Sequence, residues 1–152
     1  MKAIIRLGVA SVCLAALSAW AGAGWEDDFE KGLETAKKEN KYVLVDFSGS
    51  DWCGWCIRLD EEVFSKKPFK DYAKENLVTV LVDFPRKKKI PKKQADFNRE
   101  LAGKFNVQGY PTVLLLNSDG VEIARTGYKP GGPEEYVKHL QDLIAKAKAG
   151  AK

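Results

Sequence analysis

The sequence predicts a single α/β domain whose mixed four-stranded sheet is covered by helices on both faces. Short apolar runs rich in valine, typical of strands buried on both faces, alternate with amphipathic segments of helical period. Strands that are separated by helices pair in parallel, whereas a turn at residues 117–120 predicts an antiparallel edge. A last amphipathic helix completes the expected order α-β-α-α-β-α-β-β-α.

Helical spacing and continuous apolar runs define the elements of the first half. Phe29, Leu33 and Ala36 recur on one side of the first predicted helix. Pro68 suits the first turn of a later helix, because a helix leaves its first N–H groups unpaired. The expected elements are a helix at 25–41, a strand at 42–47, helices at 56–64 and 68–76, and a strand at 77–84.

Turn signals and a further apolar stripe define the second half. Phe97, Leu101 and Phe105 lie on one face of a predicted helix. Gly120 can supply the positive φ of a tight turn between the last two strands. The expected elements are a helix at 94–106, strands at 112–116 and 121–127, and a helix at 133–149.

Residues 1–23 have the features of a cleaved secretory signal peptide. A basic start precedes an apolar run at residues 7–17, and small residues then predict cleavage after Ala23 or two residues earlier. The apolar run is shorter than the ~20 residues of a membrane span, so we expect no stable membrane insertion after cleavage. An uncleaved anchor is the alternative. The mature domain, residues 24–152, is then expected in the periplasm or outside the cell.

Cleavage would change the cysteine count and leave a nearly balanced charge. Cys13 would be removed, which leaves Cys53 and Cys56 as a lone pair in a compartment where disulfides form. Removing Lys2 and Arg6 from the 25 basic residues leaves 23, against 21 acidic residues. This balance gives no indication of nucleic-acid binding, and a monomer is the default expectation.

Basic residues gather in residues 84–93, here called the basic loop. Arg86 and five lysines lie in it, and Pro85 and Pro91 flank its main cluster. The composition favours a solvated loop, and a docking patch for an acidic partner is the alternative.

The sequence Trp52-Cys53-Gly54-Trp55-Cys56 lies between a predicted strand and a predicted helix. A Cys-x-x-Cys at such a turn indicates a redox pair. Unpaired N–H groups and the helix dipole favour a thiolate at the first cysteine, and such positions lower a cysteine pKa from ~8.5 to ~7 or below. Gly54 allows a tight turn. The two tryptophans are expected to screen the site and contact substrates, with simple packing as the alternative.

These residues resemble the thioredoxin superfamily. Val45-Asp46-Phe47 precedes the cysteine motif, and Gly109-Tyr110-Pro111-Thr112 precedes the last strands. The resemblance covers nearly the whole mature chain and implies a thioredoxin-like three-layer sandwich. The basic loop and residues 60–64 are closer to exported bacterial thioredoxin-like proteins, and they also resemble the C-terminal domain of transmembrane disulfide reductases.

The resemblance implies a role for particular residues. Cys53 matches the attacking cysteine and Cys56 the resolving one. Pro111 matches a cis-proline whose loop offers backbone hydrogen bonds to an extended peptide, and Tyr110 should line that groove. Asp46 matches a buried acid beneath the resolving cysteine, where desolvation would raise its pKa and let it exchange protons with Cys56.

Three differences from ordinary thioredoxin bear on the reduction potential. The loop between Asp46 and Cys53 is one residue longer. The family's lysine near the buried acid has no counterpart, because Thr79 occupies the matching position. Gly54-Trp55 stands in place of Gly-Pro between the cysteines.

The sequence therefore predicts an exported thiol-disulfide oxidoreductase that reduces or exchanges disulfides in client proteins. It implies an upstream thiol-disulfide donor and no cofactor. A copper(I) carrier using the same cysteines is the alternative, as is a binding module without turnover. His139 is expected to be solvated. Asp51 either tunes the thiolate or is a solvated loop residue.

Overall fold

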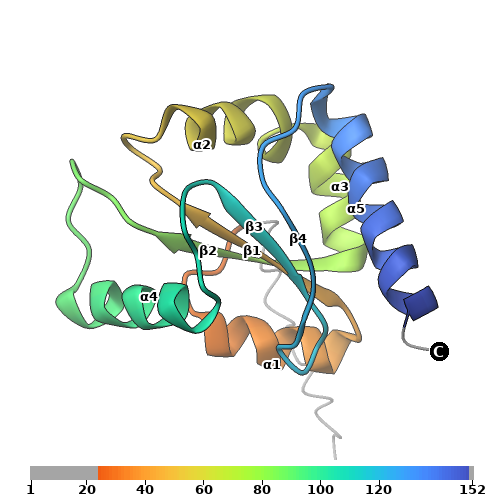
Figure 1. Ribbon diagram of the computed structural model, residues 1–152, viewed down its shortest axis with the longest axis horizontal. Helices are drawn as coiled ribbons and strands as arrows, with labels where there is room; N and C mark the ends of the chain where they lie inside the picture. The colour runs from red at the N-terminus through yellow and green to blue at the C-terminus, as the bar shows by residue number, and fades with distance from the viewer. Residues whose placement is uncertain (1–23, 151–152) are drawn as a thin grey trace, which may run out of the picture.

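The computed structural model describes residues 24–150, and the signal peptide predicted at residues 1–23 lies outside them. A four-stranded sheet runs through the middle of the domain with helices on either side, which confirms the predicted fold class (Figure 1). The predicted element order is confirmed with one addition, the π-helix η1. The elements are α1 (Phe29–Glu39), β1 (Tyr42–Ser48), α2 (Gly54–Leu59), η1 (Asp60–Phe64), α3 (Lys67–Asn76), β2 (Leu77–Asp83), α4 (Lys92–Lys104), β3 (Thr112–Leu116), β4 (Glu122–Thr126) and α5 (Gly132–Gly150).

The sheet is mixed, with the strand order β2-β1-β3-β4. β1 is parallel to β2 and antiparallel to β3, and β4 closes the predicted hairpin beside β3. Gly120 has a φ of 79° in the connecting turn, so it occupies the left-handed conformation for which glycine was expected. The carboxyl end of β1 leads directly into the cysteine motif.

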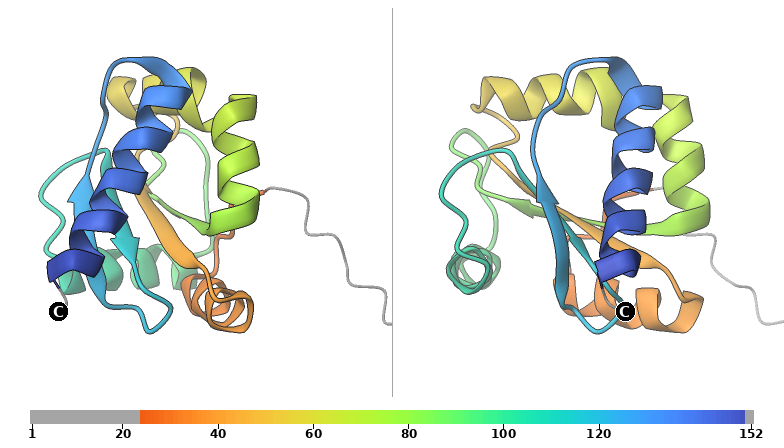
Figure 2. Two further views of the ribbon diagram at one scale, coloured as in Figure 1. Left: turned by 90° about the vertical axis from the view of Figure 1, so that its right-hand side faces the viewer. Right: turned by 45° about the vertical axis from the view of Figure 1, so that its right-hand side comes forward.

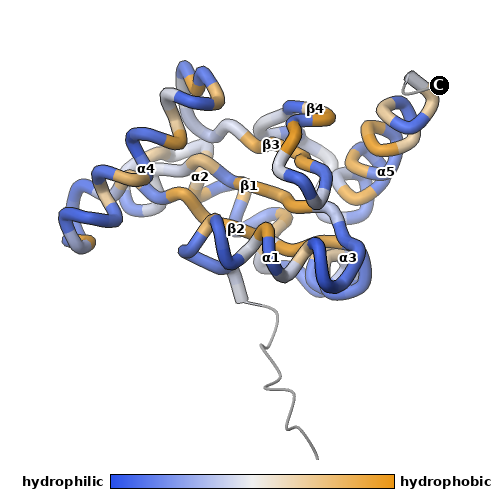
Figure 3. Tube along the Cα trace, turned by 90° about the horizontal axis from the view of Figure 1, so that it is seen from below, coloured by the Kyte–Doolittle hydropathy of each residue, from blue (hydrophilic) through white to orange (hydrophobic). Residues whose placement is uncertain are grey.

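Two helical layers cover the two faces of the sheet (Figure 2). On β1, the side chains of Val43, Val45 and Phe47 pack in the core beneath α1 and α4, whereas Leu44 packs beneath α3 and α5. Because successive strand residues point to opposite faces, Asp46 shares the face of Leu44. Hydrophobic residues concentrate on the central strands, and hydrophilic residues recur along the surrounding helices (Figure 3).

The first helix begins at Phe29 and not at Trp25, which corrects the predicted boundary. The Asp28 side chain caps it by accepting a backbone N–H of the first turn at 3.1 Å. Before the cap, the backbone of Glu26 forms a parallel bridge with Val80 in β2. The chain is therefore extended where helical spacing in the sequence had predicted the first turn.

The helix predicted at residues 56–64 is two successive helices, α2 and η1. The N–H of Ser65 donates to the carbonyl of Asp60 at 2.8 Å, which is the i→i+5 spacing of a π-turn. Val63 and Phe64 are both buried at this turn. The chain thus passes from α2 directly into η1, which packs on α3 and α5.

Candidate active site

The two cysteines lie where the loop after β1 enters α2. Cys53 is the N-cap of α2, and its sulfur accepts the backbone N–H of Cys56 at 3.3 Å. The N–H of Cys53 donates to the carbonyl of Gly49 at 2.8 Å, so the preceding loop is tight. The two sulfurs are joined in a disulfide, with the Cα atoms 5.2 Å apart. The structure therefore places the predicted pair as an oxidised disulfide at a helix start.

The residues of the motif differ in exposure. Cys53 is 7% exposed and Cys56 is 2% exposed, so a partner sulfur reaches Cys53 more readily. Trp55 is 55% exposed. Trp52 is half-buried, and its ring lies so close to Gly49 that a Cβ added there would be 2.5 Å from it. The two tryptophans therefore occupy different environments.

Asp46 is a buried acid with an unpaired oxygen. Its Oδ1 is the one buried side-chain N or O atom in residues 24–150 that has no hydrogen-bond partner. Burial, followed by the negative charges of Asp60 and Asp83, raises the pKa of Asp46 to about 8. In the strand register Asp46 pairs with Leu81 and Thr79 pairs with Leu44, so β2 places no cation opposite the acid or at the position matched from the sequence. Asp46 is therefore largely protonated at neutral pH.

The Tyr110–Pro111 bond is cis, as the sequence resemblance implied. It lies immediately before β3, whose first residue pairs with β1 near the cysteine motif. The ring of Tyr110 lies edge-on to Trp52, with 6.0 Å between centroids, and 5.1 Å from the ring of Phe84. The cis-proline loop, the cysteine motif and the basic loop therefore meet through one aromatic cluster.

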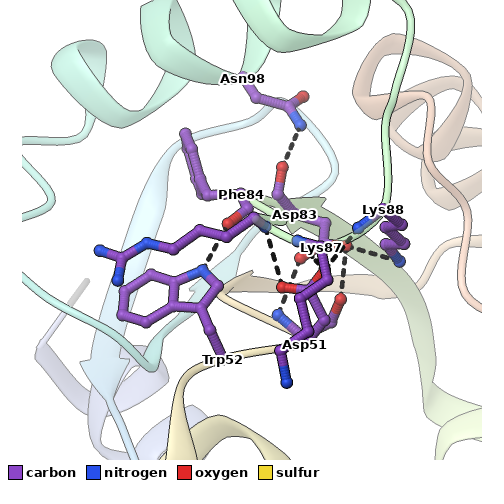
Figure 4. Close-up of polar contacts among 9 residues, drawn as sticks. Asp51, Trp52, Asp83, Phe84, Lys87, Lys88 and Asn98 are labelled. Atoms are coloured by element: carbon purple, nitrogen blue, oxygen red, sulfur yellow. Dashed lines mark hydrogen bonds and ion pairs between the residues drawn. The ribbon is translucent and has the colours of Figure 1, made fainter.

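Asp51 fixes the basic loop against the cysteine motif (Figure 4). Its carboxylate accepts backbone N–H groups from Arg86, Lys87 and Lys88 at 2.9, 2.8 and 2.9 Å. These hydrogen bonds, that of Arg86 first, hold the pKa of Asp51 below its usual range. Sequence reasoning missed this role, because the contact joins segments about 35 residues apart.

Two further contacts join the same two segments. The indole N–H of Trp52 donates to the carbonyl of Phe84 at 2.7 Å, and the guanidinium of Arg86 lies 3.6 Å from the centroid of the Trp52 ring. Nearby, the Asp83 side chain accepts the N–H and the hydroxyl of Ser50 at 3.0 and 2.6 Å. The basic loop is thus held by contacts with two successive residues, Asp51 and Trp52, and the neighbouring Ser50 is bonded to the end of β2.

A second aromatic group flanks the motif on the side of Trp55. The Trp55 and Tyr128 rings are 5.0 Å apart, and the Arg58 guanidinium lies 5.6 and 5.7 Å from their centroids. The hydroxyl of Tyr128 donates to Glu62 at 2.7 Å. Tyr128 follows β4, and no pattern in the sequence marked it as part of the site.

His139 is half-buried and bonded to a neighbouring side chain, which corrects the prediction of a solvated residue. Its Nε2 lies 2.9 Å from the hydroxyl of Thr126, and its ring is 6.1 Å from that of Tyr136. Desolvation, followed by the charge of Lys129, lowers the pKa of His139. Within residues 24–150, no group of three or more His, Cys, Asp and Glu side chains is arranged to hold a metal ion. In the same part of the chain, no helix has the length and apolarity to cross a bilayer.

Residues 29–144 match the thioredoxin-like domain family. The chain belongs to the thioredoxin-like family. It is 35% identical over 124 residues to the disulfide bond reductase DsbH of Chlamydia pneumoniae, which covers 82% of this chain and 74% of that protein. A solved structure of the DsbH oxidoreductase has a TM-score of 0.76 at 34% identity and covers 80% of this chain and 84% of its own.

A second solved structure shares the thioredoxin-like fold at lower identity. The oxidised C-terminal domain of DsbD from Neisseria meningitidis has a TM-score of 0.53 at 18% identity, covering 79% of this chain and 99% of its own. Together with the Cys53–Cys56 disulfide, the relationship to DsbH identifies this chain as a thiol-disulfide oxidoreductase. The family resemblance inferred from the sequence is confirmed.

Proposed function

We propose that this thioredoxin-like protein reduces disulfide bonds in client proteins outside the cytoplasm. The observation that carries the proposal is the Cys53–Cys56 disulfide at the start of α2, in which Cys53 retains more exposure than Cys56. The relative DsbH is described as a disulfide bond reductase, which supports the direction of electron flow proposed here.

The reaction proceeds in two exchanges between sulfur atoms. In the reduced protein, the Cys53 thiolate attacks one sulfur of the client disulfide, and the other client sulfur leaves and takes up a proton. Cys56 then attacks the Cys53 sulfur of the mixed disulfide and releases the second client thiol. Two electrons pass from the protein dithiol to the client. An upstream dithiol donor must then reduce Cys53–Cys56 and itself become a disulfide.

Asp46 is proposed to handle the proton of Cys56 in the second exchange. The ionised form of Asp46 accepts the Cys56 proton as that thiol becomes the nucleophile, and the acid then carries this proton into the oxidised product. The structure is that of the oxidised product, and a carboxyl group with a pKa of about 8 holds a proton there at neutral pH. Asp46 shares the sheet face covered by α2, and the charge of Asp60 at the end of α2 acts on it.

Clients are proposed to bind across the cis-proline loop. Tyr110 of this loop contacts Trp52, which precedes Cys53, and exposed Trp55, between the two cysteines in the sequence, offers further apolar area. An extended client segment would therefore lie over Cys53 with an aromatic group at each flank.

The direction of electron flow is tested by a redox titration of the purified protein against glutathione. We expect a reduction potential near thioredoxin's value of about −270 mV, because a reductase must donate electrons to client disulfides of higher reduction potential. Alkylation of free thiols followed by mass measurement gives the reduced fraction at each ratio. A value near about −120 mV would identify an oxidant and contradict the proposal.

Export is proposed from the signal peptide predicted at residues 1–23. We expect the protein recovered from a bacterial periplasmic fraction to begin at Gly24, or at Gly22 if cleavage follows Ala21. Mass spectrometry of the intact protein and of its N-terminal peptide measures this start. A full-length protein confined to the cytoplasmic fraction would contradict the export proposal and leave the redox chemistry untouched.

A further inference from the structure

The basic loop belongs to the surface around Cys53. The backbone N–H groups of residues 86–88 are hydrogen-bonded to Asp51, which lies two positions before Cys53. The guanidinium of Arg86 lies over the ring of Trp52, the residue that immediately precedes Cys53. Phe84 contacts Tyr110 of the cis-proline loop. The first half of the loop, with Lys87 and Lys88, therefore lies beside Asp51 and Trp52 (Figure 4), at the edge of the proposed client site.

We propose that the basic loop selects clients that carry acidic residues beside the disulfide to be reduced. The proposal rests on the proposed function and names its substrate class: polypeptides with a glutamate- or aspartate-rich segment flanking a cystine. Asp51 is the positioning residue that holds the loop at the site.

The charges of the basic loop are only partly neutralised within the protein. The Lys88 ammonium pairs with Asp83 at 2.8 Å, and the Lys92 ammonium pairs with Asp96 at 2.5 Å. Residues 86–93 include no acidic side chain. Three exposed lysines of the loop form no ion pair within residues 24–150, and they are Lys87, Lys89 and Lys93.

The way the loop is held distinguishes docking from simple solvation. A loop that is only solvated does not require a carboxylate that accepts three of its backbone N–H groups, as Asp51 does here. Such anchoring fixes where the positive charges stand before a client arrives, so less conformational freedom is lost on binding. Fixed charges at the rim of a site mainly raise the association rate and select among partners.

The test uses two disulfide peptides that differ only in flanking residues, glutamates in one and glutamines at the same positions in the other. Pre-reduced protein, freed of reductant, is mixed with each peptide, and one protein dithiol is consumed per peptide disulfide. We expect the acidic peptide to react about tenfold faster at about 10 mM salt. The ratio should approach one at about 300 mM salt, because the screening length shortens from about 30 Å to below 10 Å.

Two variants separate the placed charges from the overall charge. Lys87→Gln with Lys89→Gln removes two charges that form no ion pair while keeping the backbone N–H that Asp51 accepts, and should lower the acidic-peptide rate about threefold. The glutamine-peptide rate should not change. Asp51→Ala adds a net positive charge but frees the loop, and should still lower the ratio of the two rates.

Lys38→Gln with Lys146→Gln is the charge-matched control. Lys38 lies in the last turn of α1, before β1 begins. Lys146 lies on α5 close to Lys148, whose ammonium is 5.8 Å from the ring of Tyr42, the first residue of β1. Both lysines are exposed at the end of β1 opposite the cysteines. This control should keep the wild-type ratio of rates.

Four outcomes would overturn the proposal. Equal rates for the two peptides at low salt would do so while leaving the proposed function standing. An equal loss of preference in the Lys38 and Lys146 control would show that the charges need not lie in the basic loop. Binding of anionic lipid vesicles through Lys87 and Lys89, without a peptide preference, would assign the loop to a different partner. Failure to reduce either peptide would contradict the proposed function itself, and the docking proposal with it.

Discussion

Replacing Cys53 by serine should reduce client-disulfide turnover to the rate measured without protein. A thiolate is the nucleophile of the first exchange, and a serine hydroxyl cannot form the mixed disulfide. The buried Cys56, 2% exposed, is badly placed to take over. Insulin reduction followed by turbidity, with a dithiol as electron source, measures the loss.

Cys56→Ser should behave differently, because Cys53 can still attack. The first exchange then proceeds and the second cannot, so a disulfide-linked complex with the client should accumulate. Non-reducing electrophoresis and mass spectrometry detect it, and dithiothreitol should release the client. The double variant Cys53→Ser with Cys56→Ser is the matched control and should trap nothing. Full turnover by both single variants would contradict the mechanism.

The sheet could be predicted closely from the sequence because β1, β2 and β3 are largely buried on both faces. The run beginning at Tyr42 contains Val43, Leu44, Val45 and Phe47, and such a run gives a strong signal without help from tertiary contacts. The predicted strand at residues 112–116 coincides with β3. Helix starts were less predictable. The extended backbone of Glu26 results from its bridge to β2, and the spacing of apolar residues around Glu26 does not reveal that bridge.

The candidate site divides in the same way. The Cys-x-x-Cys motif and Tyr110–Pro111 are short sequence patterns, and the structure brings both to one end of the sheet. The anchoring of the basic loop by Asp51 depends on a side chain meeting backbone N–H groups across the ends of β1 and β2. An acid beside the motif and a basic loop between two prolines were visible separately. Only the parallel pairing of β1 and β2 makes them neighbours.

Asp46→Asn should slow turnover at neutral pH and make the mixed disulfide accumulate. An amide cannot accept the Cys56 proton, and positioned proton transfer contributes typically ~10²-fold. The first exchange, which uses Cys53, should be unaffected. Stopped-flow measurement of both exchanges separates them. Equal slowing of the two would mean that Asp46 shapes the site and does not handle the proton.

Asp46→Asn should also remove a pH dependence of stability from the oxidised protein. The folded protein holds the Asp46 proton up to a pKa of about 8, whereas an exposed aspartate in the unfolded chain loses it near ~3.9. Between these values the folded state binds one more proton, so rising pH lowers the unfolding free energy by ~1.4 kcal/mol per unit. Denaturant titrations from pH 5 to pH 8 should show the variant gaining roughly 4 kcal/mol relative to wild type.

The slope is a sharper test than the absolute stability, because an asparagine at this position adds an amide whose hydrogen bonds are not predetermined. Any fixed cost of that amide is the same at every pH and cancels when the pH dependence is compared. Asp119→Asn, which removes an exposed carboxylate paired with Lys37, is the control and should keep the wild-type slope. Parallel curves for wild type and Asp46→Asn would mean that the buried carboxyl group ionises as easily as an exposed one. Asp46 could not then hold the Cys56 proton in the oxidised protein at neutral pH.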